Sequence, residues 1–200
     1  MKRLILILPA IALFLLINTQ AYAGDIKGQV NTEAAKTKYK ANTVVYIEKA
    51  DGNFKPPVKN PHMDQKNLTF IPRVLPILVG TTVDFMNNDD VLHNVFSPDA
   101  CAGKFNLGSW KKGEIRTHKY DKVSCQSVLL CNVHPEMEAY VIVLQNPYFA
   151  VADKDGNFTI KNVPAGKYTL KVWNEKLKSG SQEITLTASG KSDIKFDMKK

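Results

Sequence analysis

Short runs of alternating apolar and polar residues make up most of the chain after residue 25, and helical periodicity is nearly absent. Alternation with a period of two is typical of strands with one buried face. Gly, Pro, Asn and Asp separate the runs, as expected of turns. The pattern therefore predicts an all-β protein built from sandwiches or barrels, with one helical turn near 99–103. The predicted strands are 26–30, 43–48, 82–87, 127–133, 140–145, 158–163, 167–173, 182–188 and 193–198.

The first 23 residues have a different character from the rest of the chain. Lys2 and Arg3 precede an apolar run over 4–17, and the small-x-small triplet AYA follows at 21–23. This order is typical of a signal peptide, here with cleavage after Ala23. The alternative is a membrane anchor, but the apolar run is short for a bilayer. We therefore expect residues 1–23 to be a signal peptide, the mature chain to have no membrane span, and the protein to be periplasmic or secreted.

The charge of the chain is moderately basic. The formal net charge is +8, and removal of Lys2 and Arg3 with the signal peptide leaves +6. No basic and aromatic cluster accompanies this charge, so nucleic acid is a poor fit as a partner. A modest positive field would help the protein to meet an acidic partner, although a merely solvated surface explains the charge equally well.

The chain has three cysteines, and an odd number leaves one unpaired in an exported protein. Cys125 and Cys131 stand six residues apart in one predicted strand. Their Cα atoms would then be roughly 20 Å apart, which is beyond the reach of a disulfide. The simplest arrangement is therefore a Cys101–Cys125 disulfide and a free Cys131.

The stretch CNVHPEM at 131–137 contains three side chains that bind soft metals, Cys131, His134 and Met137. Upstream, His93 follows the polar turn NNDD. A thiolate, two imidazoles and a weak thioether are the ligand set of a blue-copper site. Zinc also uses Cys and His, but a thioether is a poor zinc ligand, which favours copper. Each residue alone has an ordinary structural explanation; the combination, with an unpaired cysteine, predicts a site for one copper ion.

These residues also carry a family resemblance. Over roughly 65–146 the chain resembles the cupredoxins, and most of all amicyanin and its plastocyanin relatives, in GTTVDFMNND at 80–89, in HNV at 93–95 and in the short Cys-x-x-His-Pro-x-Met loop. The resemblance implies a Greek-key β-sandwich. It implies that His93, Cys131 and His134 are equatorial ligands of a type 1 copper and that Met137 is the axial one.

Two further roles are hypotheses for residues next to the ligands, and the resemblance implies the first of them. Asn94 would hydrogen-bond across to the Cys131 loop and so join the two halves of the site. Pro135 would stiffen that loop and, having no N–H, would limit hydrogen bonding near the thiolate. Glu136 and Glu138 flank Met137 and are expected to be solvated rather than ligating.

The C-terminal part resembles a second family. DKDGNFTIKNVPAGKYTLKVW at 153–173 is similar to the carboxypeptidase regulatory-like, transthyretin-like sandwich, whose first hairpin would correspond to IKGQV and NTVVYIEK within 26–49. We therefore expect 24–58 and 148–200 to form one discontinuous sandwich with 59–147 inserted as the cupredoxin domain. Such an insertion is tolerated because loop-closure entropy grows slowly with length. The alternative is an independent tail domain joined to a central domain.

Three functions are compatible with these residues. The first is transfer of single electrons between redox proteins, with a periplasmic cytochrome or dehydrogenase as a transient partner. The second is a copper-binding module for delivery or storage. The third, a multicopper enzyme, is disfavoured because only His62 and His118 remain beside the two proposed ligand histidines. We therefore expect that the protein is not an enzyme, and the resemblance implies that His134 is the partly exposed electron port. The oligomeric state is not predicted.

Overall fold

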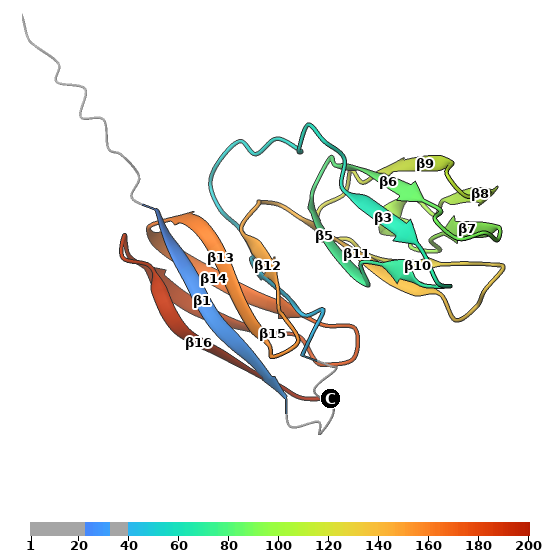
Figure 1. The fold of residues 1–200 in the computed structure, drawn as a ribbon. Coiled ribbons are helices and arrows are strands. Elements are labelled where there is room, and N and C mark those ends of the chain that lie inside the picture. Colours follow the sequence, from blue (N-terminus) through green and yellow to red (C-terminus); the bar gives the residue numbers. More distant parts are fainter. Residues whose placement is uncertain (1–22, 33–39) are drawn as a thin grey trace, which may run out of the picture.

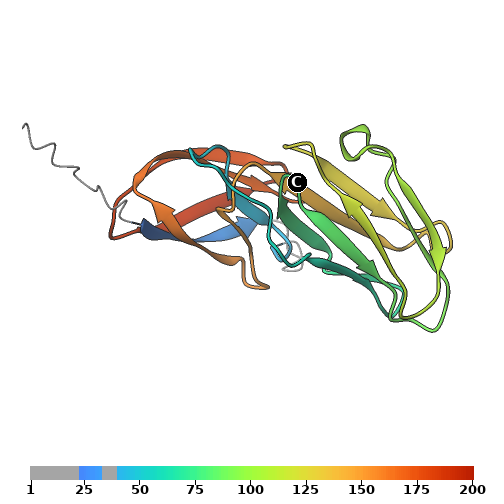
Figure 2. The ribbon, with the colours of Figure 1, turned by 90° about the horizontal axis from the view of Figure 1, so that it is seen from above.

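The computed structural model describes residues 23–32 and 40–200, and these form two β-sandwiches that lie side by side (Figure 1, Figure 2). The chain is all-β, as predicted from the alternation. Apart from Ala23, the predicted signal peptide lies outside the described residues. Within the described part of the chain, no helix has the length and apolar character that a bilayer crossing requires.

One sandwich, here called the terminal sandwich, combines strands from both ends of the described chain. Its sheets have the orders β13–β1–β16 and β12–β2–β14–β15. Apolar side chains of both sheets meet in one buried core. The strands are β1 (Ala23–Thr32), β2 (Val44–Ile47), β12 (Phe149–Val151), β13 (Asn157–Pro164), β14 (Gly166–Trp173), β15 (Gly180–Leu186) and β16 (Lys191–Met198).

Close backbone packing joins β1 to the strands from the other end of the chain. β1 runs antiparallel to β13 and parallel to β16. The turn before β13 contains Gly156 at a φ of 86°, and a Cβ there would lie 2.2 Å from the carbonyl oxygen of Val30. Only glycine combines this φ with such an approach. The Asp-Gly pair of the C-terminal motif therefore does more than close a hairpin, because it also lets the turn pack against β1.

The second sandwich, here called the central sandwich, contains the strands between these two groups. Its sheets have the orders β5–β11–β10–β7–β8 and β4–β3–β6–β9, and they enclose a separate core. The strands are β3 (His62–Gln65), β4 (Phe70–Ile71), β5 (Val74–Leu78), β6 (Thr82–Met86), β7 (His93–Phe96), β8 (Asn106–Trp110), β9 (Ile115–Lys119), β10 (Gln126–Leu130) and β11 (Glu138–Leu144).

The strands with which β1 and β2 pair bear on how the chain is divided into domains. β2 pairs with both β12 and β14, so 148–200 do not form their sandwich without the earlier strands. We retain as a proposal the division into one discontinuous sandwich of 24–58 and 148–200, with 59–147 inserted between its strands.

The observed strands differ from the predicted ones mainly where strands are short. Each predicted strand overlaps an observed one, and the predicted helical turn is a short 3-10 helix, Ala100–Ala102. The prediction for 127–133 extends too far, because β10 ends at Leu130 and CNVHPEM is a loop. β5 was not predicted because Pro76 interrupts its sequence; proline is tolerated there because β5 is an edge strand.

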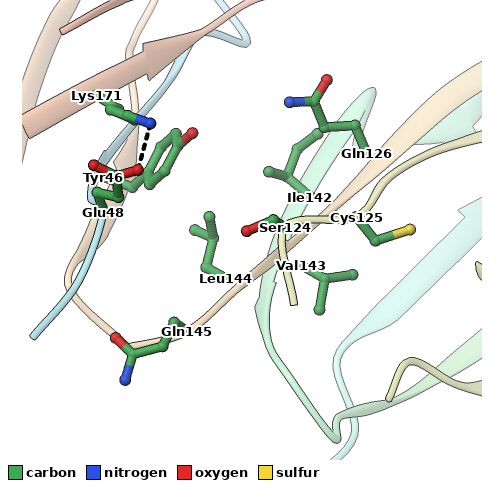
Figure 3. Close-up of a pocket in the computed structure, with 10 residues that line it drawn as sticks. All are labelled: Tyr46, Glu48, Ser124, Cys125, Gln126, Ile142, Val143, Leu144, Gln145 and Lys171. Carbon is green, nitrogen blue, oxygen red and sulfur yellow. Dashed lines mark hydrogen bonds and ion pairs between the residues drawn. The ribbon is translucent and has the colours of Figure 1, made fainter. Parts of the chain in front are cut away.

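The two sandwiches meet at a junction that is partly apolar and partly polar. Val44 and Trp173 of the terminal sandwich are buried with Val74, Ile142 and Leu144 of the central one. A cavity of about 190 Å³ adjoins this contact. Figure 3 shows its two walls, which are formed by Tyr46, Glu48 and Lys171 on one side and by residues from Ser124–Gln126 and Ile142–Gln145 on the other.

Candidate metal centre

The strand order of the central sandwich brings the four predicted ligands together. His93 is the first residue of β7, and Cys131 directly follows the last residue of β10. Met137 directly precedes β11. Because β10 lies between β7 and β11 and runs antiparallel to both, these three positions fall at the same end of one sheet (Figure 1). The short loop between Cys131 and Met137 then places His134 over that end.

Donor atoms of three of these residues converge on one point. Nδ1 of His134 lies 3.1 Å from Nδ1 of His93 and 3.9 Å from Sγ of Cys131. The three ligand atoms all lie within 4.8 Å of one another. Three donors in a plane around a metal, at about 2.0–2.1 Å for nitrogen and about 2.3 Å for sulfur, would be about 3.5 and 3.8 Å apart. The observed spacing therefore fits a single metal ion.

Three of the four predicted ligands are buried. His93 is fully buried, and Cys131 and Met137 are 3% and 1% exposed. His134 is only partly buried. Met137 packs in the same core cluster as Cys131, and its N–H donates to the carbonyl oxygen of His134 at 3.0 Å. His134 is therefore the most exposed of the four predicted ligands.

Asp89 fixes the orientation and the tautomer of His93. A carboxylate oxygen of Asp89 lies 2.8 Å from Nε2 of His93. A carboxylate only accepts hydrogen bonds, so Nε2 carries the proton and Nδ1 presents its lone pair to the site. Nδ1 of His93 then faces Nδ1 of His134 at 3.1 Å, and a cation bound between them would accept a lone pair from each imidazole in its neutral form. The chemistry of the donor set thus supports a metal ion at this point.

Backbone amides hold the Asp89 carboxylate in place. The N–H groups of Asn67 and Leu68 donate to its two oxygens at 2.6 and 2.9 Å. Burial raises the pKa of Asp89, but the hydrogen bonds from Leu68, His93 and Asn67 outweigh burial and hold this pKa below its ordinary value. The buried Asn87 side chain closes the same turn by donating to the carbonyl oxygens of Val91 and Trp110.

Asn94 connects the His93 strand with the Cys131 loop. Its backbone N–H donates to Sγ of Cys131 at 3.5 Å, and its side-chain oxygen accepts from the N–H of Asn132 at 3.3 Å. Its amide nitrogen donates to the carbonyl oxygen of Gly108. Asn94 therefore joins both halves of the site to β8. Pro135 is exposed in the loop and has no N–H to offer the sulfur.

The cysteines pair as predicted. Cys101 and Cys125 form a disulfide with Cα atoms 5.4 Å apart, and Cys131 is free and buried. Cys125 and Cys131 lie just outside the two ends of β10, which explains why they do not pair with each other.

A thiol count tests this arrangement. We expect one free thiol per chain when metal-free protein is denatured without reductant, and three after reduction, because Cys101 and Cys125 are cross-linked. Titration with a thiol reagent measures both values. Three thiols before reduction would contradict the disulfide.

Sequence reasoning identified Asp89 only as part of a polar turn and did not assign a role to Arg73. Asp89 stands four residues before His93, and this spacing is a weak signal that could have identified it. Arg73 lies far from the ligands in the sequence, and only the fold shows that it contacts Glu138, the residue after Met137.

Comparison with known families and structures gives two separate similarities. A family model described as polysaccharide lyase family 4, domain II, matches residues 134–194. No curated protein matches the chain. Among solved structures, the chain is similar to a reduced variant of amicyanin, with 21% identity over 44% of this chain and 84% of that chain and a TM-score of 0.41.

A purple cupredoxin from Nitrosopumilus maritimus is 25% identical over 42% of this chain and 99% of that chain, with a TM-score of 0.38. The Cu(I) form of another amicyanin variant is 23% identical over 48% of this chain and 86% of that chain, with a TM-score of 0.40. The chain is an all-β protein of two sandwiches, and its central sandwich contains the cluster of His93, Cys131, His134 and Met137, in which His134 is only partly buried.

Proposed function

We propose that the protein is a type 1 copper protein that carries single electrons between redox partners. The observation that carries this proposal is the convergence of the His93, Cys131 and His134 donor atoms within 4.8 Å. Met137 is buried in the same core cluster as Cys131 and would be the axial ligand. A thiolate with two imidazoles and a weak thioether is the donor set of electron-transfer copper sites, whereas zinc sites use stronger fourth ligands. Copper, when bound, supplies a one-electron couple.

The chain's own residues would keep the ligand geometry constant during such a cycle. Asp89 orients His93, and Asn94 ties Cys131 to the neighbouring strand. Neither contact involves an exposed residue of the loop between Cys131 and Met137. Rigid ligands reduce the rearrangement that accompanies electron transfer, because the donors need not move to a new geometry.

Exposed aliphatic side chains on the loops near the ligands suit brief contact with another protein. Four aliphatic side chains on the loops that carry or support the ligands are 42–49% exposed: Leu68, Val91, Leu92 and Val133. His134 lies at the partly exposed side of the cluster. We propose that electrons enter and leave through His134 and that a periplasmic cytochrome or dehydrogenase docks there transiently. Export to the periplasm or the exterior is part of this proposal, as is the absence of enzymatic activity.

The absorption and EPR spectra of copper-loaded protein test the proposed function. We expect an intense blue Cu(II) band, the EPR spectrum of a type 1 site and rapid, reversible reduction. The runner-up function is copper delivery or storage. A protein of that kind would bind only Cu(I), bleach without recovering its colour, or lose its copper readily to a chelator, and any of these results would contradict electron transfer.

The Asp89 contact predicts the direction of a shift in reduction potential. A carboxylate bonded to His93 favours Cu(II), so Asp89→Asn should raise the potential by roughly 30–60 mV, about three- to tenfold in the equilibrium constant. Spectroelectrochemical titration measures it. Asp90→Asn is the matched control, because Asp90 is 88% exposed and pairs with Lys112 instead of a ligand. Equal shifts of the reduction potential in both variants would show that the potential responds to net charge and not to the contact between Asp89 and His93.

A further inference from the structure

The junction between the sandwiches contains a charged network centred on Arg73, which lies just before β5. Its Nη2 atom donates to a carboxylate oxygen of Glu138 and to one of Glu175, both at 2.5 Å. Its Nε atom donates to the other Glu175 oxygen at 3.1 Å. Glu138 belongs to the central sandwich, and Glu175 follows β14 of the terminal one. Arg73 therefore links the two sandwiches.

This network is partly shielded from solvent and geometrically specific. The side chains of Arg73, Glu138 and Glu175 are 28%, 31% and 14% exposed. Both carboxylates accept from the planar guanidinium, and the contact to Glu175 is bidentate, the arrangement that gives such pairs their directionality. The Arg73 side chain also lies over the Tyr140 ring, with Cζ 5.6 Å from the ring centroid. Tyr140 in turn packs on Trp173 of the terminal sandwich, with ring centroids 5.3 Å apart.

The network ends at the ligand loop. Glu138 is the residue after Met137, and Nη1 of Arg73 also donates to its backbone carbonyl oxygen. Glu138, the first residue of β11, pairs with Leu130 of β10, the residue before Cys131. The N–H of Tyr140 donates to the carbonyl oxygen of Arg73 at 3.0 Å. Arg73 thus contacts both the backbone and the side chain of Glu138, the residue that follows Met137 along the chain.

We propose that the terminal sandwich is a positioning element of the metal site: Glu175 acts through Arg73 on Glu138 and sets the placement of Met137 relative to the other three donors. This inference rests on the proposed function, because it assigns Met137 to the metal. It gives the second β domain a role within this chain. Arg73 and Glu175 are positioning residues, since neither contacts a ligand side chain.

Glu175→Gln tests this role. Glutamine keeps the size of the side chain and one acceptor oxygen but weakens the contact with Arg73. Glu48→Gln is the matched control. It removes a similar ion pair, Glu48–Lys171, which lies at the same junction but joins two residues of the terminal sandwich (Figure 3).

In the copper-loaded protein, Glu175→Gln should change the intensity ratio of the two sulfur-to-copper absorption bands and the EPR symmetry, which report the axial ligand. It should also change the equilibrium constant for reduction about three- to tenfold, roughly 30–60 mV for one electron. In metal-free protein, the NMR signal of the Met137 methyl group should shift. Glu48→Gln should leave all of these at their wild-type values.

The possible results separate the two proposals. If Glu175→Gln matches the wild type in the band ratio and the Met137 methyl signal, the positioning role is wrong. A changed potential with both of those unchanged also overturns it, because loss of a charge alone would have that effect. If the wild type gives no blue band, the proposed function fails, while the methyl signal of the metal-free variants still decides whether Glu175 positions Met137.

Discussion

Cys131→Ser should abolish the blue band of the copper-loaded protein while the metal-free chain keeps its fold. The band requires a thiolate bonded to copper, and Cys131 is the free cysteine next to His93 and His134. Copper affinity should fall by more than the 10–100-fold that loss of an outer partner typically costs. A serine fits the same volume and can accept the N–H of Asn94, so we expect the free energy of unfolding without metal to fall by only about 0.5–1.5 kcal/mol.

Absorption spectroscopy, copper titration and circular dichroism measure these effects. His118→Asn is a suitable control for copper bound adventitiously at histidine. His118 stacks on Phe105, with ring centroids 3.8 Å apart, and its Nε2 contacts the carbonyl oxygen of Ala102, so it belongs to a structural contact. The control should keep the blue band in full. A blue band that survives in Cys131→Ser would exclude Cys131 as the ligand.

The sequence was informative wherever the chemistry is local. Alternation predicts the long strands because one face of each is buried, and the Cys-x-x-His-x-x-Met spacing places three candidate ligands on one loop. The disulfide follows from strand geometry, since Cys125 and Cys131 stand at opposite ends of β10. These inferences need only the rise of a strand and the preferences of soft ligands.

The contacts that support the site were not predictable in the same way. In the sequence, Asp89 has the pattern of a solvated turn residue. Only the fold shows that the N–H groups of Asn67 and Leu68 donate to its carboxylate. Arg73 and Glu175 are separated by 102 positions, and their pairing depends on how the sandwiches dock. The short strands lack enough residues to display a period. In each case the deciding partner is distant in the sequence, so the local pattern contains no signal for it.

Removal of the Cys101–Cys125 disulfide should have the largest effect on stability. The two cysteines are 24 positions apart, and opening a loop of that length should lower the free energy of unfolding by roughly 3 kcal/mol. We therefore expect the double variant Cys101→Ala/Cys125→Ala to unfold at a lower temperature, by about 6–12 °C on the scale of 2–4 °C per kcal/mol for a chain of this size. Calorimetry of metal-free protein measures the shift.

The position of the bridge makes this test specific to the ligand-bearing strands. Cys101 lies in the 3-10 helix after β7, which begins with His93, and Cys125 precedes β10, which leads to Cys131. The bridge thus ties these two strands at the end of the sheet opposite the metal cluster. The double variant should still give the blue band, because every ligand remains. Cys131→Ser, which removes a thiol but no cross-link, is the control for stability and should unfold closer to the wild type. A double variant as stable as the wild type would mean that the bridge does not restrain the unfolded chain as the loop length predicts.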